Sequence, residues 1–144
     1  MKIVKIAALV FLVLLLAAGA YSFYLIHQNS PERTVEKVLE LRGDYERNKN
    51  EIKSYMTRKY FNYQKNDIQP VNSPNCQLSR YNAGDQNRVA VLCKIQTARG
   101  DRVQNEDAAI FYLVRSGLYP FKYKYQIDDI EVVDPALTGW ISFF

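Results

Sequence analysis

A continuous apolar stretch near the N-terminus, Ile6–Ile26, most constrains what this chain can be. It contains no charged side chain, and as a helix rising about 1.5 Å per residue it would span the hydrocarbon core of a bilayer, which takes roughly 20 apolar residues. Lys2 and Lys5 precede it, and Tyr21 and Tyr24 lie near its end, where amphipathic rings favour the membrane interface. The pattern predicts a single-pass anchor with its N-terminus in the cytoplasm.

A cleaved signal peptide is the alternative reading of the same stretch. A basic start, an apolar centre and the small residues Ala18-Gly19-Ala20 satisfy its requirements, and cleavage would follow Ala20. The chain stays apolar from Tyr21 to Ile26, however, so cleavage would leave an apolar mature N-terminus, and we favour retention. Lipidation is excluded because Ala20 stands where a lipoprotein needs cysteine. Both readings place residues 27–144 outside the cytoplasm.

The rest of the chain has the size of one domain and little catalytic material. Lys2 and Lys5 lie ahead of the anchor, so 17 basic residues face 15 acidic ones beyond it, which gives no reason to expect nucleic acid as a partner. His27 is the single histidine, so histidine catalysis and most zinc sites lack residues. An acid–base site from Asp107 with Tyr112 or Tyr123 is conceivable, but any tyrosine-rich sheet offers such a trio. We therefore predict no enzyme, no cofactor and no metal.

The two cysteines, Cys76 and Cys93, flank the turn-forming segment 83–86. If that segment closes a hairpin, Cys76 lies directly opposite Cys93, at a Cα separation within disulfide range. This register predicts a disulfide, which agrees with an oxidising compartment. Two separate buried thiols and a two-cysteine metal site stay open as alternatives.

Helix signals come next in the chain, followed by strand signals. Ser30 as N-cap and Pro31 in the first turn predict a helix over 31–42, with Gly43 as its stop. A second helix is expected from about residue 44 or 48 to 63, with a break near Thr57. Residues 64–74 are expected to form a loop.

Four strand segments follow: 76–82, 88–97, 103–115 and 120–133. Tight turns between them would place Val91, Ile110 and Tyr125 in one row and make one face of an antiparallel sheet apolar and aromatic. The predicted fold class is α+β: a transmembrane helix, then two helices packed on a curved four-stranded antiparallel sheet.

This order of elements resembles the nuclear-transport-factor-2-like superfamily, especially its small bacterial envelope members. The residues that carry the resemblance are Pro31-Glu32, Val35, Val38-Leu39, Gly43-Asp44-Tyr45 and Ile127-Asp128-Asp129-Ile130-Glu131-Val132. It implies a cone with the helices in the concavity of the sheet. It also implies kinship with anchored relatives that include bitopic assembly components of type IV secretion systems. Tyr125 stands where tryptophan is common in the family, and the region before the first strand is short.

The expected organisation is a cytoplasmic segment (1–5), an anchor (6–26), a tether (27–30), a cone-like domain (31–133) and an aromatic tail (134–144). Trp140, Phe143 and Phe144 in the tail would either fold over the mouth of the cone or bind another subunit.

The basic, tyrosine-rich segment 42–65 would be a solvated helix face or, alternatively, a contact for anionic headgroups or an acidic partner. Arg99-Gly100-Asp101 is interpreted as a hairpin turn.

Three functions follow from these features, of which the first is favoured. It is a non-catalytic assembly or scaffold subunit that binds other envelope proteins, anchored in a bacterial inner membrane with its domain in the periplasm; a homo-oligomer is possible. The second is a ligand-binding or sensing module whose apolar pocket would be lined by Tyr112, Tyr123 and Tyr125. The third is an isomerase- or dehydratase-like enzyme.

Overall fold

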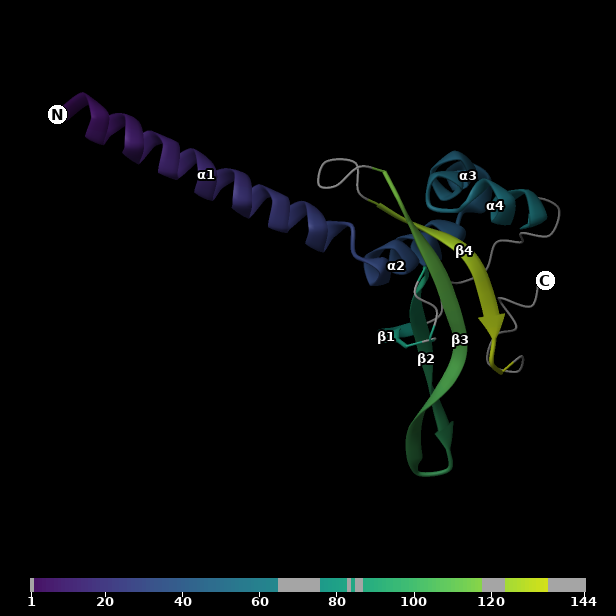
Figure 1. Ribbon diagram of the computed structural model, residues 1–144. Helices are drawn as coiled ribbons and strands as arrows, with labels where there is room; N and C mark the ends of the chain where they lie inside the picture. The colour runs from purple at the N-terminus through teal and green to yellow at the C-terminus, as the bar shows by residue number, and fades with distance from the viewer. Residues whose placement is uncertain (1, 65–75, 83, 85–86, 118–123, 135–144) are drawn as a thin grey trace.

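The computed structural model describes residues 2–64, 76–82, 84, 87–117 and 124–134 (Figure 1). Among these residues the helices precede the strands along the chain, as the sequence predicts. The elements are α1 (Lys2–Gln28), α2 (Pro31–Arg42), α3 (Tyr45–Ser54), α4 (Arg58–Gln64), β1 (Cys76–Tyr81), β2 (Val89–Arg99), β3 (Arg102–Ser116) and β4 (Lys124–Val132).

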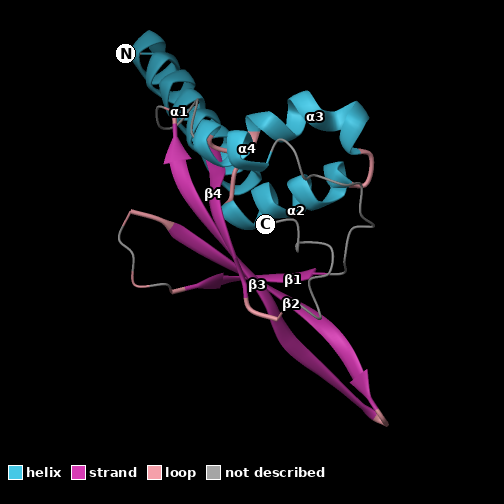
Figure 2. Ribbon diagram, turned by 90° about the vertical axis from the view of Figure 1, so that its right-hand side faces the viewer, coloured by secondary structure: helices cyan, strands magenta, loops and turns pink. Residues whose placement is uncertain are grey.

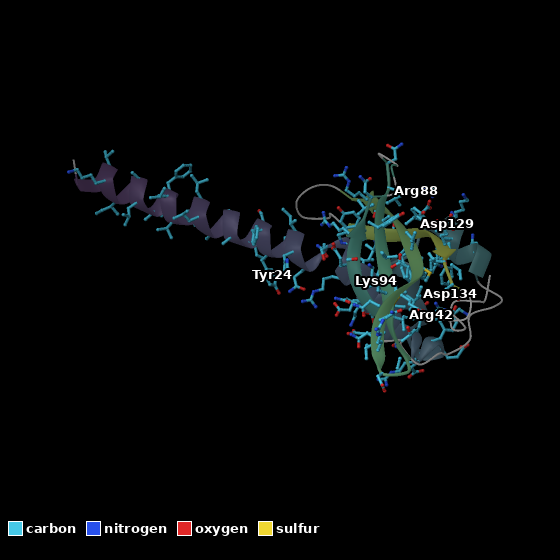
Figure 3. All side chains as sticks on the ribbon, turned by 90° about the horizontal axis from the view of Figure 1, so that it is seen from below. Tyr24, Arg42, Arg88, Lys94, Asp129 and Asp134 are labelled. Carbon is cyan, nitrogen blue, oxygen red and sulfur yellow. A yellow bond between two sulfur atoms is a disulfide. The ribbon has the colours of Figure 1, made fainter. Side chains whose placement is uncertain are left out.

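Helix α1 stands apart from the rest of the molecule (Figure 1). Over Val4–Gln28 its most apolar window has a mean hydropathy of 2.4 and is 0% buried by the protein. In length and composition it can cross a membrane, and a signal sequence would have the same properties. Figure 3 shows its side chains projecting into open space, with Tyr24 on the turns nearest the domain.

Helix α2 begins and ends where the sequence predicts. The Ser30 Oγ accepts a hydrogen bond from the backbone N–H of Arg33 at 3.3 Å, and Pro31 occupies the first turn. Gly43 follows the last helical residue and its N–H closes the helix onto the carbonyl of Glu40. The predicted helix over 31–42 is therefore confirmed.

The second predicted helix is divided into α3 and α4 by residues 55–57, which confirms the break expected near Thr57. At this break the chain meets β4: Ile127 donates its N–H to the Tyr55 carbonyl at 2.8 Å, and its own carbonyl accepts from Thr57 N–H at 2.9 Å. Met56 and Ile127 thereby form a short parallel bridge. The outer edge of β4 is closed at this point.

The sheet is open and antiparallel, in the order β1-β2-β3-β4. Figure 2 shows α2, α3 and α4 on one side of it. The α+β class and the four antiparallel strands are as expected, although the helices beyond α1 number three because of the break.

The disulfide between Cys76 and Cys93 is present, but the strand register that predicted it is wrong. In the structure Cys76 pairs with Ile95 and Leu78 with Cys93, so β1 is shifted by two residues along β2. The two cysteines are diagonal neighbours with a Cα separation of 5.2 Å, still within disulfide range. A shift by two residues preserves the face on which a side chain lies, which is why the bond survives the error.

The face predicted for part of β3 is also wrong, because a β-bulge changes the register between Cys93 and Lys94. The tip of the β2–β3 hairpin pairs as expected, with Lys94 opposite Asp107. Beyond the bulge Val91 faces Phe111 rather than Ile110. One extra residue turns every following side chain to the other face of the sheet.

The main core therefore contains Phe111 and Leu113 in place of Ile110 and Tyr112. It joins the inner faces of the helices to the inner face of the sheet. Its largest fully buried side chains include Phe111, Ile52, Leu113, Ile127, Val35, Val38 and Val91. A smaller cluster, Ala90, Leu92 and Ile110 with Tyr112 beside it, lies on the outer face.

The pairing of β3 with β4 also departs from the prediction. Leu113 lies opposite Ile127 and Ser116 opposite Lys124, so the row Val91–Ile110–Tyr125 does not form. A second register shift falls between Tyr112 and Leu113. The expected start of this strand at Pro120 lies outside the described residues.

Candidate partner-binding surfaces

The junction between α1 and α2 keeps the domain close to the apolar helix. Only Asn29 and Ser30 separate the two helices. Asn29 N–H donates to the Leu25 carbonyl at 3.0 Å, and Thr34 N–H donates to the Ser30 carbonyl at 3.0 Å. Any surface near Ser30 is therefore next to the end of α1.

A groove of about 710 Å³ lies between α2 and β1, beside this junction. It is lined by His27 from the end of α1, by α2, and by alternate residues of β1. Leu39, Cys76 and Leu78 provide its apolar lining, while acidic and basic side chains provide the rest: Glu32, Arg33, Glu36, Glu40 and Arg80. Such a mixture of apolar and charged groups suits a peptide segment better than a small apolar ligand.

Ion pairs hold several of these charged groups. Arg80 Nε lies 2.8 Å from Glu32 Oε1, which ties β1 to the first turn of α2. Arg33 pairs with Glu36 at 3.2 Å along the helix. The Glu36 and Glu40 side chains remain at least half exposed, so they are accessible to a partner.

The two edges of the sheet differ. Besides the backbone bonds at Ile127, β4 is linked to the α3–α4 connection by Gln126, whose Nε2 donates to the carbonyls of Ser54 and Met56, each at 3.1 Å. Lys124 Nζ also donates to the Ser54 carbonyl, at 3.2 Å. Within the described part of the chain, by contrast, no strand pairs with the outer edge of β1. An unpaired edge of this kind is a ready template for an added strand.

A second groove, of about 610 Å³, lies between α4 and β4 and contains the Asp128 carboxylate. Asp128 accepts a hydrogen bond from the Thr57 hydroxyl at 3.0 Å and pairs with Arg88 at 3.2 Å. Its side chain is only 15% exposed, so these contacts compensate its burial. Asp128 therefore has a structural role, in which its carboxylate is held by Thr57 and Arg88.

Of the residues proposed for an acid–base site, the two that are described, Asp107 and Tyr112, have other partners. Asp107 is exposed and lies 3.5 Å from Lys94. Tyr112 instead donates from its hydroxyl to Glu131 Oε2 at 2.7 Å, and this hydrogen bond raises the pKa of Tyr112 to about 12. Tyr123 lies outside the described residues.

The predicted pocket of three tyrosines does not form from the two that are described. Tyr125 belongs to the main core, whereas Tyr112 packs against the small cluster on the outer face. The two side chains lie on opposite sides of the sheet, because the extra residue of β3 at the Cys93/Lys94 register shift turns Tyr112 to the outer face.

Over residues 42–62, the basic, tyrosine-rich segment buries one set of side chains and exposes another. Tyr45, Tyr60 and Phe61 are buried, and Lys53 Nζ lies 5.5 Å from the centre of the Phe61 ring. Arg42 is buried with them, and desolvation lowers the pKa of its guanidinium. The predicted solvated face is present, with Glu46, Lys53 and Arg58 among its exposed residues, but Tyr45, Tyr60 and Phe61 lie in the core instead.

The remaining predicted site residues, Trp140, Phe143 and Phe144, lie outside the described residues. Across residues 2–64, 76–82, 84, 87–117 and 124–134, no group of three or more His, Cys, Asp or Glu side chains is placed to hold a metal ion.

Sequence reasoning missed the α2–β1 groove, although a signal was present. Glu32, Glu36 and Glu40 recur every four residues, which places them on one side of a helix beside its apolar face. The partner of that helix could not be identified without the register of β1.

Comparisons with known proteins give this chain no relatives: no family model matches it, and neither does any curated protein or solved structure.

Proposed function

We propose that this chain is a single-pass membrane protein whose domain lies outside the cytoplasm and binds other envelope proteins as a non-catalytic assembly subunit. The observation that carries the proposal is α1, an apolar helix that is 0% buried by the protein. Two residues join it to a domain in which a disulfide links β1 to β2. An apolar helix of this length, left exposed by the protein, fits a lipid environment. The disulfide fits an oxidising compartment.

The compartment proposed is the periplasm of a bacterium, with the N-terminus in the cytoplasm. Lys2 and Lys5 support this orientation, since basic residues favour the cytoplasmic side. The proposed fold family is the nuclear-transport-factor-2-like superfamily. Its support is the order of helices and strands and the packing of α2 to α4 on one side of the sheet (Figure 2).

Protein binding is supported by the α2–β1 groove. It combines an open strand edge, an apolar floor and accessible carboxylates next to the end of α1. A strand or extended segment of a partner would gain main-chain hydrogen bonds from β1 and side-chain contacts from Leu39 and Leu78.

Anchoring is tested by expressing the full chain in a bacterium, extracting the membranes with carbonate and sequencing the N-terminus. We expect the chain to stay in the membrane with residues 1–20 attached, and its domain to be digested by protease added to spheroplasts. A soluble polypeptide that begins at Tyr21 would refute the anchor.

Partner binding is tested separately with a photo-crosslinking amino acid at Glu36, in the groove, and at Glu46, an exposed residue of α3 outside it. We expect discrete crosslinks to another protein from position 36 and none from position 46. Equal labelling at both positions, or none at either, would contradict the assignment of the groove.

A further inference from the structure

The hairpin between β2 and β3 extends beyond the rest of the sheet. The last partner of β1 along β2 is Ile95, and β4 reaches β3 only as far as Ala109. Residues 96–107, here called the arm, thus consist of Gln96–Arg99 and 102–107 of β3, joined by the turn at Gly100. In Figure 2 the arm points to the lower right, while α1 leaves the domain at the upper left.

The tip of the arm is exposed in the described part of the structure. Its residues Arg102, Val103, Gln104 and Asn105 are all exposed, and Val103 is 69% exposed. A two-stranded ribbon alone is marginally stable in water, whereas three or more strands with a packed face can be stable. No described strand pairs with 102–107 on the side away from β2.

Residues 102–106 of that free edge are complementary to themselves. Arg99 and Arg102 pair across a two-residue turn, so Val103, Asn105 and Asp107 direct their backbone N–H and C=O groups to the open side. Two copies related by a twofold axis can then pair Val103 with Asn105, which places Gln104 opposite Gln104. The same register places Arg102 of each copy opposite Glu106 of the other.

Two further features favour this pairing. Opposite charges on directly facing residues stabilise a pair of strands, and the twofold axis repeats the favourable pair. The segment 102–106 also contains neither lysine nor proline, and its two charged residues, Arg102 and Glu106, are of opposite sign.

We propose that the arm is a self-association element, in which residues 102–106 of β3 pair antiparallel with the same residues of a second copy. The product is a continuous four-stranded ribbon in the order β2-β3-β3-β2. Its interface is isologous, so it closes as a dimer.

The geometry is tested with single cysteines in the full chain in detergent, where both native cysteines are already bonded to each other. Gln104→Cys places two thiols at the twofold axis, with Cα atoms about 4.5–5.5 Å apart, and should form a disulfide-linked dimer under mild oxidation. Gln96→Cys, on the neighbouring strand, should stay monomeric on a non-reducing gel. Efficient crosslinking of Ser79→Cys instead would assign self-association to the β1 edge and overturn the proposal.

The energetics are tested by charge reversal. Arg102→Glu replaces two attractions by two repulsions and should raise the dimer dissociation constant on the order of tenfold, measured by light scattering in detergent. Adding Glu106→Arg should restore the dimer, and Arg58→Glu, an exposed reversal on α4, should leave it unchanged. A wild-type monomer, or a dimer indifferent to Arg102→Glu, would refute the proposal.

Discussion

The hydroxyl of Thr57 donates a 3.0 Å hydrogen bond to the carboxylate of Asp128, across 71 positions of sequence. Thr57 also begins α4: its carbonyl accepts from Phe61 N–H at 2.9 Å, and its hydroxyl oxygen accepts from Tyr60 N–H at 3.3 Å. One side chain therefore caps a helix and fastens that helix to β4.

Thr57→Ala should lower the free energy of unfolding by about 1–2 kcal/mol, because the cap is lost and Asp128 loses a hydrogen-bond donor. The measurement is denaturant unfolding of the full chain in detergent, followed by near-UV circular dichroism. Thr57→Ser keeps the hydroxyl and should retain most of the stability. An equal loss in both variants would show that the methyl group, not the hydrogen bond, matters.

Replacing both Cys76 and Cys93 by serine should cost about 3 kcal/mol, since the disulfide closes a loop between residues 17 positions apart. Reductant should lower the unfolding midpoint of the wild-type chain to about the midpoint of the double variant. The double variant serves as the control, because reductant should not affect it. If the wild-type midpoint did not change once the Cys76–Cys93 disulfide was fully reduced, this prediction would be contradicted.

Tyr112 should titrate near pH 12, because its hydroxyl donates to Glu131 and ionisation would break that bond. A folded-state pKa above the ordinary value of about 10 contributes stability that is complete below pH 10 and is lost as the pH rises towards 12. Glu131→Gln should lower the pKa of Tyr112, as read from its ring carbon resonance in NMR. Tyr112→Phe identifies that resonance, and an unchanged pKa in Glu131→Gln would exclude the hydrogen bond as the cause.

Phe111→Ala should reduce stability by about 3–5 kcal/mol, because it removes a large side chain that is 1% exposed. Val103→Ala, in the exposed arm, should change stability by less than about 0.5 kcal/mol. Thermal unfolding of the two variants in the same detergent compares them. If Phe111→Ala were as mild as Val103→Ala, the assignment of faces in β3 would be wrong.

Local signals in the sequence were sufficient for the helices and for the disulfide. Ser30, Pro31 and Gly43 set the limits of α2, because caps act through neighbouring backbone groups. The break near Thr57 was visible as an interruption of the helical pattern. Cys76 and Cys93 could be paired because their faces were right even though their register was not.

The register of the longer strands could not be read in the same way. Residues 108–114 of β3, Ala-Ala-Ile-Phe-Tyr-Leu-Val, are apolar on both faces, so alternation gives no information about which side is inward. The bulge between Cys93 and Lys94 then reverses the assignment of Ile110 and Phe111. The closure of β4 by Tyr55 and Thr57 depends on contacts with Ile127, 72 and 70 positions away, and nothing local in the sequence indicates them.

The short link at Asn29 and Ser30 limits how this domain can meet other molecules. Two residues, even fully extended, span at most about 7 Å, so with α1 embedded in lipid the domain cannot rise far from the headgroups. Encounters would then take place by lateral diffusion within a thin layer at the bilayer surface, and a protein whose nearest segment stays well above that layer would never reach the domain.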